Sequence, residues 1–135
     1  MSSPIVSRWP VGLTVDITPD DVDATGVLSD DGALRINAEA SSAYFALCET
    51  VSLADLDVRS TDIRRGPASP TDVVSVSAGV VEIFRDSFVL SVRIRPGGSD
   101  GVVADVWSVL SPGADVPNAM RDEFIALAHS ASFIH

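Results

Sequence analysis

Acidic residues gather in two short stretches near the start of the chain, and these residues are the best suited to chemistry. The first stretch is the turn Asp21-Val22-Asp23-Ala24-Thr25-Gly26, and the second is Ser29-Asp30-Asp31-Gly32. The second stretch has the side-chain oxygens expected at the start of a helix. A carboxylate can attack a carbonyl group or activate a water, and backbone N–H groups at a helix start can stabilise the resulting oxyanion. The alternative is that both stretches serve only as turn and capping residues.

A long helix is predicted directly after these residues, over about residues 31–49. Ala33, Ile36 and Ala40 follow the spacing of three and four residues that marks one apolar helix face. Further alanines widen this face, and polar residues are few for a surface helix of this length. The pattern therefore predicts a largely buried helix with other backbone packed closely against it.

Strand patterns surround the helix, with one before it and four after it. Apolar and polar residues alternate over residues 11–17, and strands are again predicted over about residues 54–58, 74–83, 88–94 and 102–110. A slip in the alternation predicts a β-bulge at Gly79. A short amphipathic helix, over about residues 118–129, closes the chain.

The order of these elements predicts an α+β fold in a single domain. Hairpin connections between the later strands imply a largely antiparallel sheet of about five strands, wrapped around the long helix. The core is expected over about residues 11–128, with residues 1–8 and 130–135 flexible. A ferredoxin-like fold would need a second helix between strands, and a cystatin-like fold would begin with the helix, so both alternatives are disfavoured.

The charge and composition of the chain exclude several classes of partner. Nineteen acidic residues stand against nine basic ones, all of them arginine, and the formal charge is −10. This balance argues against binding nucleic acid or an anionic membrane. No apolar run approaches the roughly 20 residues of a membrane helix, and no signal peptide is visible. The single Cys48 fits a cytoplasmic protein, and the use of Ala, Val, Asp and Arg hints at a bacterial source.

Other reactive groups are scarce in this sequence. The two histidines, His129 and His135, lie near the C-terminus, and no cluster of Cys and His predicts a zinc site or any other metal site. No Gly-rich phosphate loop follows a strand. The Gly-x-Ser-x-Gly motif of α/β-hydrolases is absent. The sequence therefore predicts no cofactor.

Four short motifs lie along the chain in an order that resembles one known family. They are the acidic turn at residues 21–27, Gly66-Pro67, Thr71-Asp72-Val73-Val74 and Val116-Pro117-Asn118-Ala119-Met120-Arg121. Together they resemble the hotdog-fold thioesterases related to 4-hydroxybenzoyl-CoA thioesterase, over about residues 11–127. The resemblance implies the hotdog fold and a thioesterase acting on an acyl-CoA or acyl-carrier-protein thioester. It also implies a homodimer, or a dimer of dimers, joined through sheet edges with the active site between subunits.

The resemblance also implies which residues act. Asp23 takes the position of the catalytic carboxylate. Glu39 is the second candidate, because counting from Asp30-Asp31-Gly32 places it at the helix carboxylate of other hotdog branches. Arg64 and Arg65 are candidates for binding substrate phosphates, although neighbouring strand residues point to opposite faces and only one can serve a given groove. The candidate oxyanion donors at the helix start and in the preceding turn are Gly26, Val27, Ser29, Asp31 and Gly32.

Other functions stay open at this point. Glu39 could simply pair with Arg35 four residues earlier on the helix surface. Val27-Leu28-Ser29-Asp30 stands where many relatives carry His-Val-Asn-Asn. The chain could therefore be a hotdog module that binds an acyl or aromatic ligand without turning it over, or a dimer that serves as a structural scaffold. A hydratase is disfavoured because no His lies beside the long helix.

Overall fold

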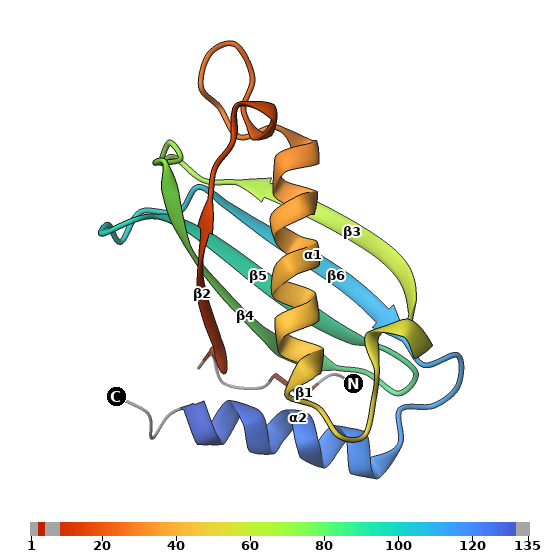
Figure 1. Cartoon of the computed structure of the whole chain (residues 1–135). Helices are drawn as coiled ribbons and strands as arrows, with labels where there is room; N and C mark the ends of the chain where they lie inside the picture. Colours follow the sequence, from red (N-terminus) through yellow and green to blue (C-terminus); the bar gives the residue numbers. More distant parts are fainter. Residues whose placement is uncertain (1–2, 5–8, 132–135) are drawn as a thin grey trace.

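The computed structural model describes residues 3–4 and 9–131 and has one antiparallel sheet with two helices (Figure 1). The strands are β1 (Ser3–Pro4), β2 (Val11–Asp16), β3 (Asp57–Arg65), β4 (Val73–Ile83), β5 (Phe88–Pro96) and β6 (Ala104–Ser111). The helices are α1 (Asp30–Ala46) and α2 (Asn118–Ala131), with 3-10 turns η1 (Pro19–Asp21) and η2 (Leu53–Asp55). The sheet runs β4-β5-β6-β3, and both β2 and the two-residue β1 pair with the other side of β4. This arrangement confirms the predicted α+β fold and its order of elements.

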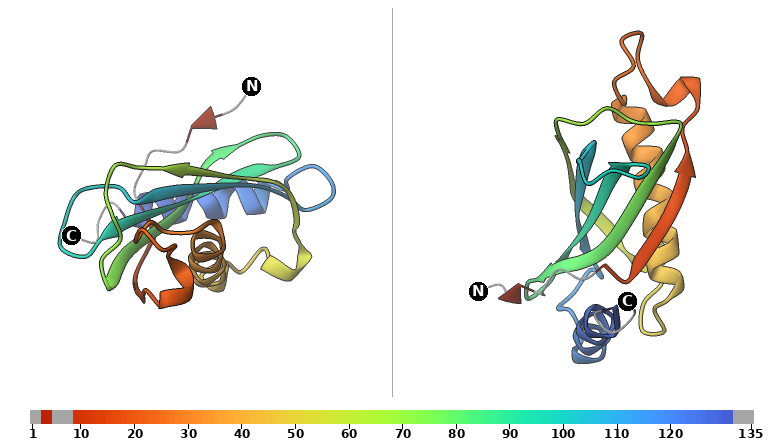
Figure 2. Two further views of the ribbon diagram at one scale, coloured as in Figure 1. Left: turned by 90° about the horizontal axis from the view of Figure 1, so that it is seen from above. Right: turned by 90° about the vertical axis from the view of Figure 1, so that its left-hand side faces the viewer.

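Helix α1 lies across one face of the sheet, which curves around it (Figure 2). Ala33, Ile36 and Ala40 are fully buried against the sheet, as their spacing predicted. The opposite side of the helix is open, and Leu34 is 42 % exposed. The prediction of a largely buried helix was therefore wrong for the single chain, because the sheet covers only one side of α1.

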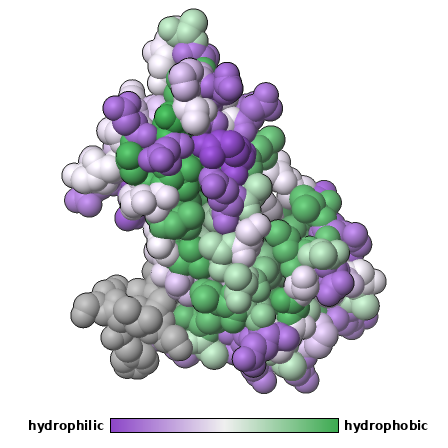
Figure 3. All heavy atoms as spheres, in the orientation of Figure 1, coloured by the Kyte–Doolittle hydropathy of each residue, from purple (hydrophilic) through white to green (hydrophobic). Residues whose placement is uncertain are grey.

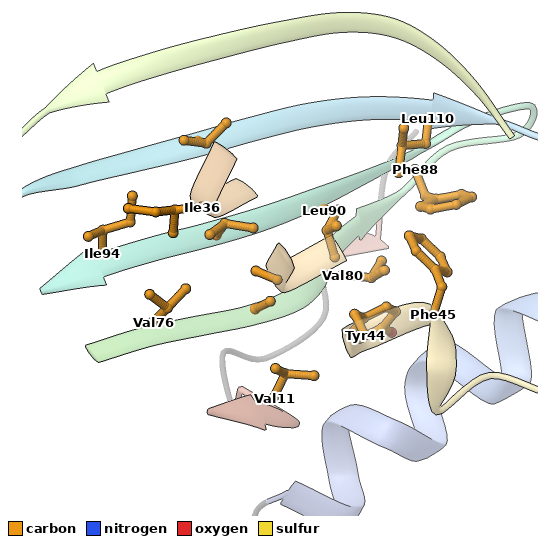
Figure 4. Packing of buried hydrophobic residues seen from close by; sticks show 14 of the residues in the cluster. Val11, Ile36, Tyr44, Phe45, Val76, Val80, Phe88, Leu90, Ile94 and Leu110 are labelled. Atoms are coloured by element: carbon orange, nitrogen blue, oxygen red, sulfur yellow. The ribbon is translucent and has the colours of Figure 1, made fainter. Parts of the chain in front are cut away.

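Aromatic side chains close the core at the C-terminal end of α1 (Figure 4). Tyr44 and Phe45 meet edge to face, with ring centroids 5.2 Å apart. Phe88 on β5 lies 4.6 Å from Phe124 of α2, and Phe124 also packs against Tyr44. Aromatic pairs of this kind stabilise a core beyond the area that they bury. These contacts hold α2 across one end of the sheet. The acidic turn lies at the other end, where α1 begins.

Three local predictions differ from the structure. The strand predicted over residues 54–58 is instead the turn η2 followed by β3, because the alternation of Ala54, Leu56 and Val58 continues across the turn. The bulge in β4 falls between Val80 and Glu82 rather than at Gly79. The C-terminal helix α2 ends at residue 131 rather than at about 129. Of the ends predicted to be flexible, residues 3–4 lie in β1 and residues 130–131 in α2, and the rest lies outside the described residues. Within the described part of the chain, neither helix has the length and apolar character needed to cross a membrane.

Candidate functional site

The acidic turn folds back on itself and leads directly into α1. A two-stranded bridge joins Val22 to Leu28, and the Asp23 N–H donates to the Val27 carbonyl at 2.8 Å. Gly26 sits at φ 82°, a left-handed conformation that glycine adopts without strain. The turn therefore projects as a compact loop from the end of the molecule where α1 begins (Figure 1).

Asp23 presents an exposed and firmly oriented carboxylate in this loop. Its Oδ1 accepts hydrogen bonds from the Thr25 hydroxyl at 2.6 Å, the Thr25 N–H at 2.8 Å and the Val27 N–H at 3.1 Å. The Thr25 hydroxyl bond, followed by the Val27 and Thr25 amide bonds, holds the pKa of Asp23 below its usual range. All three bonds fall on Oδ1. The second oxygen, Oδ2, has no partner among the described residues, so it is available to a ligand or a water.

Asp21 is the residue that sequence reasoning missed. It is 3 % exposed, and its carboxylate receives a forked pair of bonds from Arg35, Nε to Oδ1 at 2.8 Å and Nη2 to Oδ2 at 2.7 Å. The Thr18 N–H and hydroxyl also donate to Oδ2. The hydrogen bond from Arg35 is the main reason that the pKa of Asp21 falls to about 2. Asp21 therefore ties the turn to α1, and only the placement of Arg35 in space could have revealed this pairing.

The backbone of Asp21 also lies directly against the first turn of α1. Its carbonyl accepts hydrogen bonds from the Ser29 N–H at 2.8 Å and the Ser29 hydroxyl at 3.0 Å. Ser29 is the N-cap of the helix and accepts from the Gly32 N–H at 3.0 Å. A Cβ atom at Gly32 would lie 2.4 Å from the Asp21 carbonyl oxygen. Glycine at this position is what allows the turn and the helix to approach so closely.

Gly32→Ala is therefore expected to destabilise the protein by about 1–3 kcal/mol, as overpacking against fixed backbone usually does. The matched control is Gly12→Ala in β2, where an added Cβ would meet nothing within 4 Å. Urea unfolding followed by circular dichroism measures both variants. Equal stability of the two variants would contradict the close packing of the turn on α1.

The start of α1 offers fewer free N–H groups than the sequence suggested. The N–H groups of Gly26, Val27 and Ser29 donate within the turn, and that of Gly32 donates to Ser29 Oγ. Among the candidate donors, only the Asp31 N–H lacks an acceptor within residues 9–131. The Asp30 N–H, which is not among the predicted donors, is unpaired there as well. Unpaired N–H groups at a helix N-terminus can bind a negatively charged oxygen.

Glu39 lies on the open side of α1, two turns from the helix start. Its side chain is 49 % exposed and forms an ion pair with Arg35 at 3.0 Å. Arg35 also donates to the Asp16 carbonyl and holds Asp21. The predicted surface pairing of Glu39 with Arg35 is thus observed. Glu39 therefore belongs to the network of charged side chains that holds the turn against α1. This pairing is compatible with Glu39 as a second candidate for the catalytic carboxylate.

The two neighbouring arginines of β3 point to opposite faces of the sheet, as predicted. Arg65 donates to the Leu28 carbonyl and to Asp30, so it lies against the helix start and close enough to Asp23 to help lower the pKa of that carboxyl. Arg64 pairs with Asp62 at 3.0 Å and lies 4.3 Å from the Trp107 ring centroid on the other face. Of the two candidates, the structure brings only Arg65 to the turn.

Two hollows flank the turn. A small one of about 140 Å³ is lined by Val27, Leu28, Arg65 and the segment after β3. A larger one of about 510 Å³ lies on the other side, against Val22 and Gly26. The described residues contain no group of three or more potential metal ligands. The turn and the helix start therefore offer a carboxylate oxygen and two N–H groups that are unpaired among the described residues, and one arginine, Arg65, that lines the smaller hollow.

Comparison with known proteins identifies the fold. Neither a protein-family model nor a curated protein sequence matches the chain. Among solved structures, it is similar to a thioesterase from Thermus thermophilus in complex with coenzyme A and zinc, with 22 % identity, a TM-score of 0.76 and coverage of 92 % of this chain and 98 % of the other.

Two further structures match over most of their length. An aspartate-to-asparagine mutant of 4-hydroxybenzoyl-CoA thioesterase, in complex with 4-hydroxybenzoyl-CoA, has 17 % identity and a TM-score of 0.68, covering 90 % of this chain and 99 % of the other. A thioesterase-superfamily protein from Jannaschia sp. CCS1 has 14 % identity and a TM-score of 0.72, covering 96 % and 94 %. The chain therefore has the fold of these thioesterases, the hotdog fold that its motifs predicted.

Proposed function

We propose that this protein is a thioesterase that hydrolyses an acyl-CoA or acyl-carrier-protein thioester at the acidic turn. The observation that carries the proposal is the Asp23 carboxylate, which is exposed in the turn before α1 and held through Oδ1, with Oδ2 unpaired among the described residues. A carboxylate oriented in this way can act as a base on a water or as a nucleophile. A predicted cytoplasmic location remains part of the proposal.

The reaction needs a carboxylate and donors for the developing charge. In one route, Asp23 Oδ2 takes a proton from a water as that water attacks the thioester carbonyl carbon. In the other route, Oδ2 itself attacks the carbonyl carbon. The unpaired N–H groups of Asp30 and Asp31 stabilise the oxyanion. When Asp23 acts as a base, collapse of this intermediate breaks the C–S bond, and the thiolate takes up the proton held by Asp23 as the carboxylic acid is released. When Asp23 attacks directly, collapse expels the thiolate and leaves an acyl anhydride on Asp23, which a water then hydrolyses to the acid and free Asp23. Arg65 offers its charge to the anionic end of the substrate.

The similar structures support a CoA thioester as substrate. One of them holds coenzyme A, and another, an aspartate-to-asparagine mutant, holds 4-hydroxybenzoyl-CoA. A protein that binds a thioester while lacking one aspartate fits the role proposed here for Asp23. Glu39 is the alternative carboxylate, although it is paired with Arg35 at 3.0 Å.

A homodimer is part of the proposal, because the sheet has one long free edge. β3 pairs only with β6 among the described strands, and eight of its nine residues are exposed. A long exposed edge invites pairing with another strand. Val58 on this edge is 62 % exposed, and apolar residues gather along α1 and toward η2 on the same side of the molecule (Figure 3). A second copy joined at β3 would cover this surface.

The dimer can be tested directly. Sedimentation at micromolar concentration is expected to give a dimer, and Val58→Asp is expected to weaken it by at least about tenfold, since an unpaired carboxylate would be buried at the edge. Val73→Asp, at an exposed valine on β4, is the matched control and should leave the dimer intact. A monomeric wild-type protein would contradict this part of the proposal.

A second candidate function is an acyl-binding module without turnover. The three hydrogen bonds on Asp23 Oδ1 are those of a turn-forming aspartate, which would explain the residue without catalysis. Measuring thiol release and acyl-CoA binding on the same samples separates the two functions. Release of thiol supports the thioesterase, whereas tight binding without release supports the binding module.

A further inference from the structure

The outer face of the sheet, opposite α1, contains another hollow that is unrelated to the turn. Along β5, Val92 and Ile94 point to α1 and are fully buried, so Ser91, Arg93 and Arg95 point to the outer face. These residues line a hollow of about 510 Å³ together with Trp9 and Trp107. Figure 2 shows α1 on one side of the sheet only. A volume of this size suits a small ligand.

Among the described residues, Arg95 is the unpaired cation of this hollow. The other described arginines all bond to an oxygen: six form ion pairs with Asp or Glu, and Arg121 donates to two backbone carbonyls. Arg95 has no such partner within residues 9–131, and its Nε atom is buried without an acceptor. In a chain with 19 acidic residues against nine arginines, an unpaired arginine in a hollow points to an anion from outside the chain.

The two tryptophans add an apolar wall and a second donor. Trp107 Nε1 is buried and also lacks an acceptor in the described part of the chain. Arg93 is already neutralised by Asp105, with contacts of 2.8 and 3.1 Å, and lies 5.8 Å from the Trp9 ring centroid. Among the described residues, the hollow therefore provides one unpaired arginine, one unpaired indole N–H and two indole rings on which a planar ring can pack. One of these rings, Trp107, already has the Arg64 guanidinium over one face at 4.3 Å from its centroid.

The remaining charges favour an anion with a single negative charge. Glu82 also lines the hollow, but it faces Val89 across the strands, whereas Arg95 lies six residues further along β5. At about 3.3 Å per residue, the backbone positions of Glu82 and Arg95 are roughly 20 Å apart along the strands. At that distance Glu82 repels neither a carboxylate nor a phosphate bound at Arg95. The negative field of the whole protein, in contrast, disfavours a multiply charged phosphate group more than a carboxylate with a single charge.

From these contacts we infer that the outer hollow binds a small aromatic carboxylate, with its carboxylate at Arg95, its ring against the indoles of Trp9 and Trp107, and an oxygen accepting from Trp107 Nε1. The site lies on the face of the sheet opposite α1. It therefore does not depend on the proposed thioesterase function, and either can fail without the other.

Tryptophan fluorescence tests the inference, because both tryptophans of the chain line the hollow. Titration with benzoate and hydroxybenzoates is expected to give a saturable change. Arg95→Gln should weaken binding by about 10–100-fold, the usual effect of losing a hydrogen bond to a charged group, and Trp107→Phe by about fivefold. Arg59→Gln, which removes an arginine paired with Asp86 elsewhere, is the matched control and should bind like the wild type. Asp23→Asn should also bind normally, which separates this site from the turn.

Other outcomes would overturn the inference. Failure of every aromatic carboxylate to give a saturable change excludes the site, as does an unchanged affinity in both Arg95→Gln and Trp107→Phe. Tighter binding of adenosine monophosphate or inorganic phosphate than of benzoate would contradict the choice of a carboxylate. Self-association that Arg95→Gln abolishes, without ligand binding, would show that a second copy occupies this face. Far-UV circular dichroism establishes that each variant is folded.

Discussion

Asp23→Asn is expected to slow thioester hydrolysis by about 10²–10⁴-fold, the range that a positioned general base contributes. Asparagine keeps an oxygen that can accept the bonds from Thr25 and Val27, so the turn should keep its shape. It loses the negative charge and the basic oxygen that the reaction needs. The fall is expected in kcat, with little change in the binding of the acyl-CoA substrate.

Glu39→Gln is the control for this experiment. Glu39 is half exposed and pairs with Arg35, and its replacement is expected to change the rate by less than about threefold, since exposed ion pairs contribute little. Because hydrogen bonds within the turn lower the pKa of Asp23, this base stays ionised well below neutral pH. As the pH is lowered, the rate of hydrolysis should therefore begin to fall only below the pH at which an ordinary aspartate takes up a proton. If Glu39→Gln abolishes hydrolysis and Asp23→Asn does not, the helix carboxylate is the catalytic one.

Asp21→Ala is expected to destabilise the protein by about 2–4 kcal/mol. Removing one partner of a fully buried ion pair usually lowers the free energy of unfolding by more than this. Here the Arg35 side chain is 40 % exposed, so water solvates the arginine that is left unpaired and reduces the loss of stability. The change also removes the partner of the Thr18 N–H and hydroxyl. Urea unfolding at neutral pH measures the effect. Asp20→Ala, at the exposed neighbour, is the control and should lie within about 0.5 kcal/mol of the wild type.

The same pair has a pH signature. Asp21 has a pKa of about 2 in the folded protein, compared with 3.8 for an ordinary aspartate. The pair therefore stabilises the folded state above pH 3.8, and the stabilisation is lost as the pH falls toward about 2. The shift corresponds to roughly 1–2 kcal/mol after allowance for solvent around Arg35. In Asp21→Ala, this part of the pH dependence of unfolding should be absent. An identical pH dependence in both proteins would show that Asp21 is not the responsible group.

The order of elements could be predicted from the sequence because it depends on local patterns. The alternation along residues 88–94 and the apolar spacing of Ala33, Ile36 and Ala40 each reflect burial on one face, and the structure confirms both. The alternation of apolar and polar residues through 54–58 wrongly predicted a strand there, since the same pattern also fits a 3-10 turn that leads into the strand β3. Likewise, the burial of α1 was overestimated because a single chain covers only one side of it.

The site was less predictable, since its contacts join residues far apart in the chain. Asp21 and Asp23 look alike in the sequence, yet one is buried against Arg35 and the other is exposed. The alternation rule gave opposite faces for Arg64 and Arg65, but it could not say which face meets the turn. The sequence could not show which of the candidate N–H groups are available to a ligand. In the structure, the N–H groups of Gly26, Val27, Ser29 and Gly32 already donate to acceptors in the turn and the N-cap.

Thiol release from a panel of short, long and aromatic acyl-CoA esters tests the central claim most directly. The wild-type protein is expected to release free thiol from at least one ester at a rate that follows enzyme concentration. Asp23→Asn should bind the same ester and release almost none. If the wild-type protein binds an acyl-CoA ester but releases no thiol from any member of the panel, it is not a thioesterase on CoA esters, and the turn serves binding alone.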